Sequence, residues 1–334
     1  MTTRHTDVAI IGGAIMGSAT AYFLKKLSPS LAVTVIEPDP TYEFCSTLRA
    51  SGGARRLFSC PENIEMSKYS IDFIKAFAQV MAVGEAGDIR EAPVDWVVGG
   101  YLFILPPAGM AMLESNYAIQ RAHGCDVALL TTTQLKEHFP SMFVDDLAGG
   151  VLSPRNGWCD PNGLLQGFKR KATSLGVRYV NGRVSTLART GASLTHAPLA
   201  SGEVIGASAF VNAAGAWSGV IAGLAGVPLP VAPMRRLEHY FTCGRAIESL
   251  PLVKDLARLA FRPEGVGFFG GLVNGDEQRG FNPDIPLGGS SSLRGVWRAI
   301  CGHFGRSLVA NSDAIGSSRT TKLPRNSPRH PSAS

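Results

Sequence analysis

Residues 7–26 read DVAIIGGAIMGSATAYFLKK, and VTVIEPD follows at residues 33–39. The apolar run at 7–11 ends in two glycines, which is typical of a buried parallel strand. Residues 14–27 have apolar side chains at helical spacing, and the second quoted stretch is another buried run, which ends at Glu37. Two strands joined by a helix within about 30 residues form a right-handed βαβ unit. The sequence therefore predicts an α/β fold with a doubly wound, Rossmann-like sheet.

The turn between this strand and helix resembles the phosphate-binding pattern G-x-G-x-x-G, with Ala14 at the position of the second glycine. Gly12 permits a tight turn, a small residue at position 14 lets backbone N–H groups approach a pyrophosphate, and Gly17 allows close packing. Glu37 can hydrogen-bond ribose hydroxyls and would repel a 2′-phosphate. We therefore expect a dinucleotide to bind here. The motif alone does not separate FAD from NAD.

The chain has 334 residues, which at about 150 residues per domain suggests two domains. Its hydrophobic content of 45% is that of a globular protein and excludes a disordered or collagen-like chain. The net charge of +6 comes from residues 290–334, which hold seven basic residues and one acidic residue. The remaining residues are electrically balanced. The charge therefore does not indicate nucleic-acid binding by the folded part.

Six cysteines are scattered without a C-x-x-C pair, so we expect reduced thiols in a cytoplasmic protein. The seven histidines show no zinc-type spacing, and no metal is expected. Residues 204–234 lack charged side chains and exceed the roughly 20 residues of a membrane span. Asn212 and three prolines in this stretch favour a buried strand, a glycine turn and a short helix, so no membrane span is predicted.

Hydrophobic periodicity, together with the positions of glycine and proline, predicts the remaining helices and strands. Helices are expected at 64–80, 110–124, 134–138 and 161–175, with Thr131–Thr133 and Asp160 as N-terminal caps. Strands are expected at 96–105 (as a pair or a bulged strand), 177–180, 210–215, 237–243 and 259–270. A hairpin is expected at 186–209, with its turn at Ser201–Gly202. The chain is thus expected to weave between two sheets.

Several stretches, taken in order, resemble the D-amino-acid/glycine oxidase family of flavoproteins. They are the two stretches quoted above, CSTLRASGGARRLFS at 45–59, GWCDPNGLLQGFKRKATSLGVRYV at 157–180 and FVNAAGAWSG at 210–219. PENIEMSKYSIDFI at 61–74 and MLESNYAIQRAHGCDV at 112–127 are most similar to the branch of complex I assembly factors and its bacterial relatives. The resemblance covers residues 5–285 and implies FAD as the cofactor. No cysteine or histidine stands in a recognisable flavinylation setting, so the FAD is expected to be non-covalent.

The resemblance also implies which residues contact the adenosine and phosphate parts of FAD. Gly12, Gly13, Ala14 and Gly17 would bind the pyrophosphate, and Glu37 would bind the adenosine ribose. Ser46 and Thr47 lie where the family places small hydroxyl residues against the pyrophosphate and ribityl chain. An ordinary polar turn is the alternative interpretation of these two residues.

Two further segments correspond to family segments that contact the flavin ring. Gly52 and Gly53 match the loop that passes beside the isoalloxazine. Ala214, Gly215 and Trp217 match a second flavin-contact segment, where a glycine lets the backbone approach closely. Simple helix–strand packing would also explain this second pattern.

Basic residues are the candidates for substrate binding. Arg55 falls where some relatives place a basic residue near the flavin or the substrate, and it is the one catalytic candidate that the sequence singles out. Arg235, Arg236 and His239 precede or enter a strand expected in the second sheet. One of these groups could hold a substrate carboxylate, but the sequence does not pick one over a structural role.

The expected organisation has an FAD-binding domain, a substrate domain with a mixed or antiparallel sheet, and a tail. The FAD-binding domain comprises residues 5–95 and 145–235, the substrate domain 96–144 and 236–289, and the tail 290–334. The tail is basic and rich in Ser and Pro, and we expect it to be disordered. It lacks the third flavin-contact pattern of the family, as a truncated or frameshifted gene would, and a natural basic tail is the alternative.

The sequence thus favours an FAD-dependent oxidoreductase that oxidises a C–N bond of a small amine or amino acid. The chemistry belongs to the flavin, and the protein positions the substrate. The alternatives are a non-catalytic flavin-binding assembly factor or chaperone, a truncated and impaired flavoprotein, and an NAD-dependent dehydrogenase. The sequence does not indicate the oligomeric state, the particular substrate or the electron acceptor.

Overall fold

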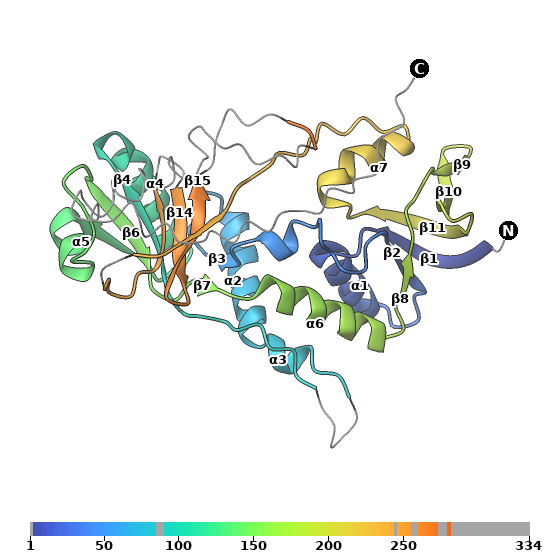
Figure 1. Ribbon diagram of the computed structural model, residues 1–334, viewed down its shortest axis with the longest axis horizontal. Coiled ribbons are helices and arrows are strands. Elements are labelled where there is room, and N and C mark those ends of the chain that lie inside the picture. Colours follow the sequence, from blue (N-terminus) through green and yellow to red (C-terminus); the bar gives the residue numbers. More distant parts are fainter. Residues whose placement is uncertain (1–2, 85–89, 244–245, 256–258, 273–278, 282–334) are drawn as a thin grey trace.

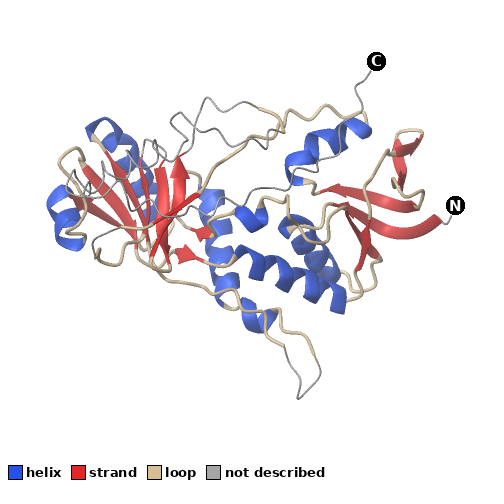
Figure 2. Ribbon diagram, viewed as in Figure 1, coloured by secondary structure: helices blue, strands red, loops and turns tan. Residues whose placement is uncertain are grey.

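The fold has two large β-sheets at opposite ends of an elongated molecule, with helices between them (Figures 1 and 2). The computed structural model describes residues 3–84, 90–243, 246–255, 259–272 and 279–281. The predicted tail at 290–334 lies outside these residues. The predicted two-sheet α/β architecture is confirmed.

The first sheet has six strands in the order β8-β2-β1-β11-β10-β9. These are β8 (Arg178–Asn181), β2 (Val33–Glu37), β1 (Thr3–Ile11), β11 (Val204–Asn212), β10 (Ser193–Pro198) and β9 (Ala188–Thr190). The pairs β1–β2, β1–β11 and β2–β8 are parallel, whereas β9 and β10 add an antiparallel edge. The first βαβ unit is the one that the opening motif predicts.

Helices cover both faces of the first sheet. On one face, α1 (Ile15–Leu27) and α6 (Pro161–Ser174) pack through Ala21, Tyr22 and Phe168 against Ile10 and Val35. On the other face lies the short helix α7 (Ser218–Leu224) (Figure 1). Apolar side chains thus fill both faces of the central strands, as a doubly wound sheet requires.

The capping predictions are confirmed at both helices that they concern. The Asp160 carboxylate accepts hydrogen bonds from the N–H groups of Asn162 (2.9 Å) and Gly163 (2.8 Å) at the start of α6. Thr131 forms a reciprocal capping box with Gln134 at the start of α5 (Thr132–His138). In each case the cap satisfies N–H groups that the first helical turn leaves unpaired.

The second sheet has seven strands in the order β12-β15-β14-β13-β4-β6-β5. These are β12 (His239–Phe241), β15 (Gly267–Leu272), β14 (Leu259–Glu264), β13 (Leu252–Asp255), β4 (Tyr101–Leu105), β6 (Gly149–Ser153) and β5 (Ala128–Thr131). Only the β4–β13 pair is parallel among these strands. The sheet is therefore mixed and largely antiparallel, as predicted.

Alternation along β4 sends its side chains to two different layers. Tyr101 and Leu105 pack with Leu113 of α4 (Met110–Ala122), whereas Leu102 and Ile104 pack with Leu135 of α5. The face that carries α4 also borders α2 (Pro61–Lys75), which is followed by the short helix α3 (Phe77–Val80). A small sheet of β3 (Gly53–Ala54) and β7 (Gly157–Trp158) joins the two parts of the molecule.

Four elements differ from the sequence prediction. The helix expected at 64–80 begins at Pro61 and breaks at Ala76, and Phe77 after the break is fully buried against Phe168. The strand expected at 96–105 begins only at Tyr101, because Gly100 takes a φ of +81°.

The other two differences are hairpins. The region expected as one strand at 259–270 is β14 and β15, which turn at Gly265 with a φ of +55°. Between 186 and 212 the chain forms three strands, β9, β10 and β11, with one turn at Gly191 and another at Ser201–Gly202. The predicted turn at Ser201–Gly202 is confirmed, whereas local periodicity does not show the turns at Gly191 and Gly265, since each depends on one glycine.

The sheet to which β6 belongs differs from the predicted domain division. Strand β6 pairs with β4 and β5 in the second sheet, although the prediction gave residues 145–235 to the first domain. The chain therefore crosses toward the first sheet after Ser153, through β7 and into α6. The domain boundaries themselves stay a prediction.

The uncharged stretch at 204–234 contains strand β11, a glycine turn and helix α7, as predicted, and residues 225–234 follow as turn and loop. Within the described ranges, no helix has the length and apolar character needed to cross a bilayer. The described cysteines are all free thiols, and Cys301 lies outside the described residues. In the same part of the chain, no three His, Cys, Asp or Glu side chains cluster as metal ligands would.

Candidate active site

The first part of the candidate site is the edge where parallel strands β1, β2 and β11 end. Ile11 is in register with Ile36 on one side and with Asn212 on the other. Strand β2 lies next to β1 on one side and β11 lies next to it on the other, so the strand order reverses at β1. Such a switch point, at the carboxyl ends of parallel strands, is where doubly wound sheets bind ligands.

The glycine turn after β1 has the geometry that its motif predicts. Gly12 has a φ of +100°, and a Cβ there would lie 2.4 Å from the carbonyl oxygen of Ala213. A Cβ on Gly17 would lie 1.8 Å from the carbonyl oxygen of Gly12. Glycine is therefore required at both positions, at Gly12 by backbone conformation and close approach and at Gly17 by close approach alone.

Glu37 is bound to this turn. One carboxylate oxygen accepts a hydrogen bond from the N–H of Gly13 at 2.7 Å, and the other accepts from the N–H of Asp39 at 3.0 Å. The carboxylate thus fixes the turn to the end of β2. Ala14 at the start of α1 has no side chain that can cap the first helical N–H groups, and no acidic residue occupies the first turn. Those N–H groups remain suited to an anion.

The predicted second flavin-contact segment lies directly beside the glycine turn. The N–H of Ala213 donates to the carbonyl of Ile11 at 2.8 Å, which fixes the start of the segment to β1. Gly215 has a φ of +54° and open space where a Cβ would lie. Trp217, partly exposed, stacks on Phe281 with ring centroids 5.1 Å apart. The fold therefore brings together two segments that are about 200 residues apart in the sequence.

The loop at 45–55 is fixed by contacts with α6 and β7. Ser46 and Thr47 begin a single 3₁₀ turn (Thr47–Arg49) that packs against α6. Gly52 has a φ of +70°, its carbonyl accepts from the N–H of Cys159 at 3.1 Å, and a Cβ would lie 2.0 Å from the Cys159 carbonyl. Gly53 begins strand β3. The loop thus leads from the first sheet to the second and ends at Arg55.

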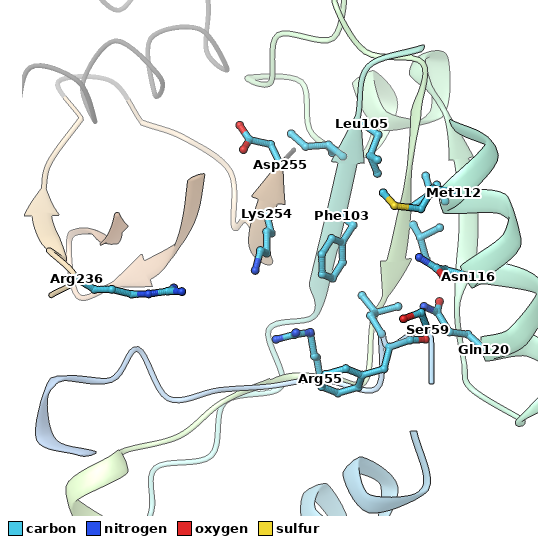
Figure 3. Close-up of a pocket in the computed structure, with 15 residues that line it drawn as sticks. Arg55, Ser59, Phe103, Leu105, Met112, Asn116, Gln120, Arg236, Lys254 and Asp255 are labelled. Carbon is cyan, nitrogen blue, oxygen red and sulfur yellow. The ribbon is translucent and has the colours of Figure 1, made fainter. Parts of the chain in front are cut away.

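The second part of the candidate site is a pocket of about 530 Å³ against the second sheet (Figure 3). Its apolar wall is formed by Leu57, Phe58, Phe103, Met112, Leu113 and Val151. Charged side chains on its border are Arg55, Arg236, Lys254 and Asp255. Its volume and its mainly apolar lining with a few polar groups are those of small-molecule sites.

Arg55 is held in the pocket by aromatic rings. Its guanidinium lies 4.5 Å from the ring centre of Phe58, 5.6 Å from that of Tyr101 and 5.8 Å from that of Phe103. Its Nε is buried and has no hydrogen-bond partner among the described residues. Burial raises the pKa of Tyr101, and the adjacent Arg55 opposes this rise. An arginine so placed presents a cation to an anionic ligand.

The predicted residues thus separate into two groups. Residues 12–17, Glu37 and the segment 213–217 lie at the edge of the first sheet where β1, β2 and β11 end, whereas Arg55 lies in the pocket. Ser46, Thr47, Gly52 and Gly53 lie in the loop that connects the two groups. Of the three further basic candidates, Arg236 lines the pocket and Arg235 and His239 do not.

Sequence reasoning missed Lys254, Asn116 and Gln120 as pocket residues. A signal for Gln120 was present, because Leu113, Asn116 and Gln120 follow one another at spacings of three and four. These spacings place two amides on the apolar face of α4.

The chain matches a known protein family over most of its length. The family described as FAD dependent oxidoreductase matches residues 7–327 of the chain. The chain belongs to this family. The match extends beyond residues 5–285, which the resemblance of the quoted motifs covers, and reaches into the part outside the described residues.

Curated relatives agree with this membership. The chain is 35% identical over 304 residues to FAD-dependent oxidoreductase domain-containing protein 1 of Bos taurus, covering 79% of this chain and 61% of the relative. It is 34% identical over 321 residues to the Xenopus laevis protein of the same name, covering 84% and 62%. Mouse sarcosine dehydrogenase is 25% identical over 261 residues, covering 75% and 27%. The chain therefore spans about three fifths of the length of the first two relatives.

Solved structures share the fold. L-proline dehydrogenase from P. horikoshii has a TM-score of 0.75 at 23% identity and covers 91% of this chain and 78% of its own. Glycine oxidase from Geobacillus kaustophilus has a TM-score of 0.74 at 19% identity and covers 90% and 78%. The chain therefore has the fold of these two solved structures.

FAD is the cofactor of the family, and the residues at the edge of the first sheet fit it. Backbone contacts at Gly12 and Gly17 hold the start of α1 against the end of β1, and the uncapped N–H groups of that helix start suit a pyrophosphate. The Glu37 carboxylate lies beside that turn, where it suits ribose hydroxyls and not a 2′-phosphate. Residues 12–17 and Glu37 would hold the dinucleotide part of FAD.

Proposed function

We propose that this protein oxidises a C–N bond of a small amine or amino acid with FAD. The observation that carries the proposal is the pocket in which Arg55 borders an apolar wall. An amino acid presents a carboxylate that a guanidinium can bind, and its side chain can lie on the apolar surface. Relatives named for sarcosine and fold neighbours named for proline and glycine support this substrate class.

In this proposal the chain's own residues bind and orient the substrate. Arg55, already oriented by three aromatic rings, holds the carboxylate. Phe58 and Phe103 exclude water from the reacting end, which strengthens electrostatic contacts there. Bound FAD supplies the two-electron oxidation, so no strong acid or base is required from the protein.

The direct test is the visible spectrum of the purified protein. We expect a flavin spectrum that bleaches without oxygen when the right member of a panel of N-methyl and D-amino acids is added. Retained flavin that no member of the panel bleaches would instead favour the non-catalytic assembly factor or an impaired flavoprotein. Absence of any flavin would overturn the proposal.

The same sample tests the mode of FAD attachment. We expect acid precipitation to release all of the yellow colour into the supernatant, because the site is built from backbone groups and a carboxylate and has no cysteine among the pocket residues. Colour retained in the washed pellet would show a covalent bond. A reducing, cytoplasmic setting is part of this proposal, and it is supported by the free thiols among the described cysteines.

Substitution of Arg55 by methionine tests the carboxylate site. A charge-assisted hydrogen bond contributes about 1.5–3 kcal/mol, so we expect KM for an amino acid to rise about ten- to hundredfold. FAD content should remain unchanged. The control is Arg56→Met, because Arg56 points to Asp72 at 3.2 Å and does not line the pocket. An equal loss in both variants would assign Arg55 to structure alone.

A further inference from the structure

One polar side chain at the α4 end of the pocket is buried but only half paired. Gln120 is 5% exposed and lines the pocket. Its Nε2 donates a hydrogen bond to the carbonyl oxygen of Phe58 at 3.2 Å. That carbonyl can only accept, so the bond fixes which end of the amide is nitrogen and which is oxygen.

The other end of this amide, Oε1, is buried and has no hydrogen-bond partner in the described part of the chain. A buried acceptor without a partner costs about 1–3 kcal/mol, and native proteins contain few of them. In Figure 3, Gln120 lies with Asn116 and Ser59 on the helix side of the pocket. An acceptor in this position is suited to a donor on a bound ligand.

The pocket therefore has two chemically different ends. Arg55, with its own buried and unpaired Nε, offers donors at one end. Gln120 offers an acceptor on the helix side, and apolar side chains that include Phe58, Phe103 and Leu113 form much of the remaining lining. A ligand that satisfies both ends has an anion, an apolar middle and a terminal N–H or O–H.

We propose that Gln120 determines specificity by accepting a hydrogen bond from the far end of the substrate's side chain. The inference rests on the proposed function for the identity of the anion, which is the amino-acid carboxylate. It narrows the substrate class to amino acids whose apolar side chain ends in a hydrogen-bond donor. A glycine-sized substrate would leave Oε1 unpaired, and a site built around a donor discriminates against an analogue that lacks it.

Binding of matched carboxylates tests this assignment without any turnover. The probes are 3-(4-hydroxyphenyl)propanoate against 3-phenylpropanoate, and 6-hydroxyhexanoate against hexanoate, titrated calorimetrically into the full FAD-loaded protein. We expect the hydroxylated member of at least one pair to bind about tenfold more tightly or better. Equal affinity within both pairs, or no binding by any probe, overturns the inference.

Two variants then test whether Gln120 causes the preference for the hydroxyl. In Gln120→Met the preference for the hydroxyl should disappear, so that the ratio of the two Kd values within each probe pair falls to about one. Gln79→Met, the same change on the exposed side of α3, should keep the preference. A preference that survives in Gln120→Met overturns the assignment. If Gln120→Met does not fold, equal affinity within both probe pairs on the unmodified protein still overturns the inference.

The outcomes also separate this inference from the proposed function. A hydroxyl preference in binding, with no bleaching by any amine, would retain the specificity site and reject the oxidase activity. Bleaching by N-methyl amino acids, with equal rates for N-methyltyrosine and N-methylphenylalanine and no preference in either probe pair, would retain the activity and reject the role of Gln120.

Discussion

Replacement of Gly17 by alanine is expected to abolish FAD retention and to lower the free energy of unfolding by about 3 kcal/mol, at the upper end for overpacked sites. A Cβ at this position would lie 1.8 Å from the carbonyl oxygen of Gly12, which is backbone and cannot rotate away. Either α1 must move away from β1 or the turn must open. Both changes separate the N–H groups that the pyrophosphate needs. Flavin absorbance per protein and denaturant unfolding measure the two effects.

The matched control is Gly223→Ala in helix α7. A Cβ there meets nothing within 4 Å, so alanine should be neutral or stabilise the helix by about 0.5–1 kcal/mol. FAD content should not change. If Gly17→Ala retained FAD as well as the Gly223→Ala protein does, the close approach of α1 to β1 would not be needed for the cofactor.

Replacement of Glu37 by arginine is expected to weaken FAD binding more than hundredfold. The native carboxylate accepts from the N–H groups of Gly13 and Asp39, and in the proposed FAD site it would also accept from ribose hydroxyls. Hydrogen bonds to a charged group contribute about 1.5–3 kcal/mol each, and arginine has no acceptor to replace them. Equilibrium dialysis of FAD against the apoprotein measures the change.

Two variants identify the cause of that loss. Glu43→Arg makes the same change of charge in the following loop, on an exposed side chain, and should leave FAD affinity nearly unchanged. Glu37→Gln keeps one acceptor and should bind FAD with intermediate affinity. Should Glu37→Arg and Glu43→Arg weaken binding equally, the effect would come from net charge and not from the contacts of Glu37.

The sequence by itself determined the first βαβ unit and its glycine turn, because the residues involved are close in the chain. Gly12, Gly17 and Glu37 lie within 26 residues, and the register of β1 and β2 follows from the helix between them. The cap at Asp160 is equally local, since its partners are two and three residues away. Such interactions are encoded by spacing alone.

Only the tertiary structure decided which residues form the pocket. Arg55 and Gln120 come from a loop and a helix 65 positions apart, and their common pocket also needs Lys254 from β13. Spacing shows which face of α4 is apolar, but not which element packs against it or that the Phe58 carbonyl takes one end of Gln120. The unpaired Oε1 follows from that packing, because burial and pairing depend on neighbours that are distant in sequence.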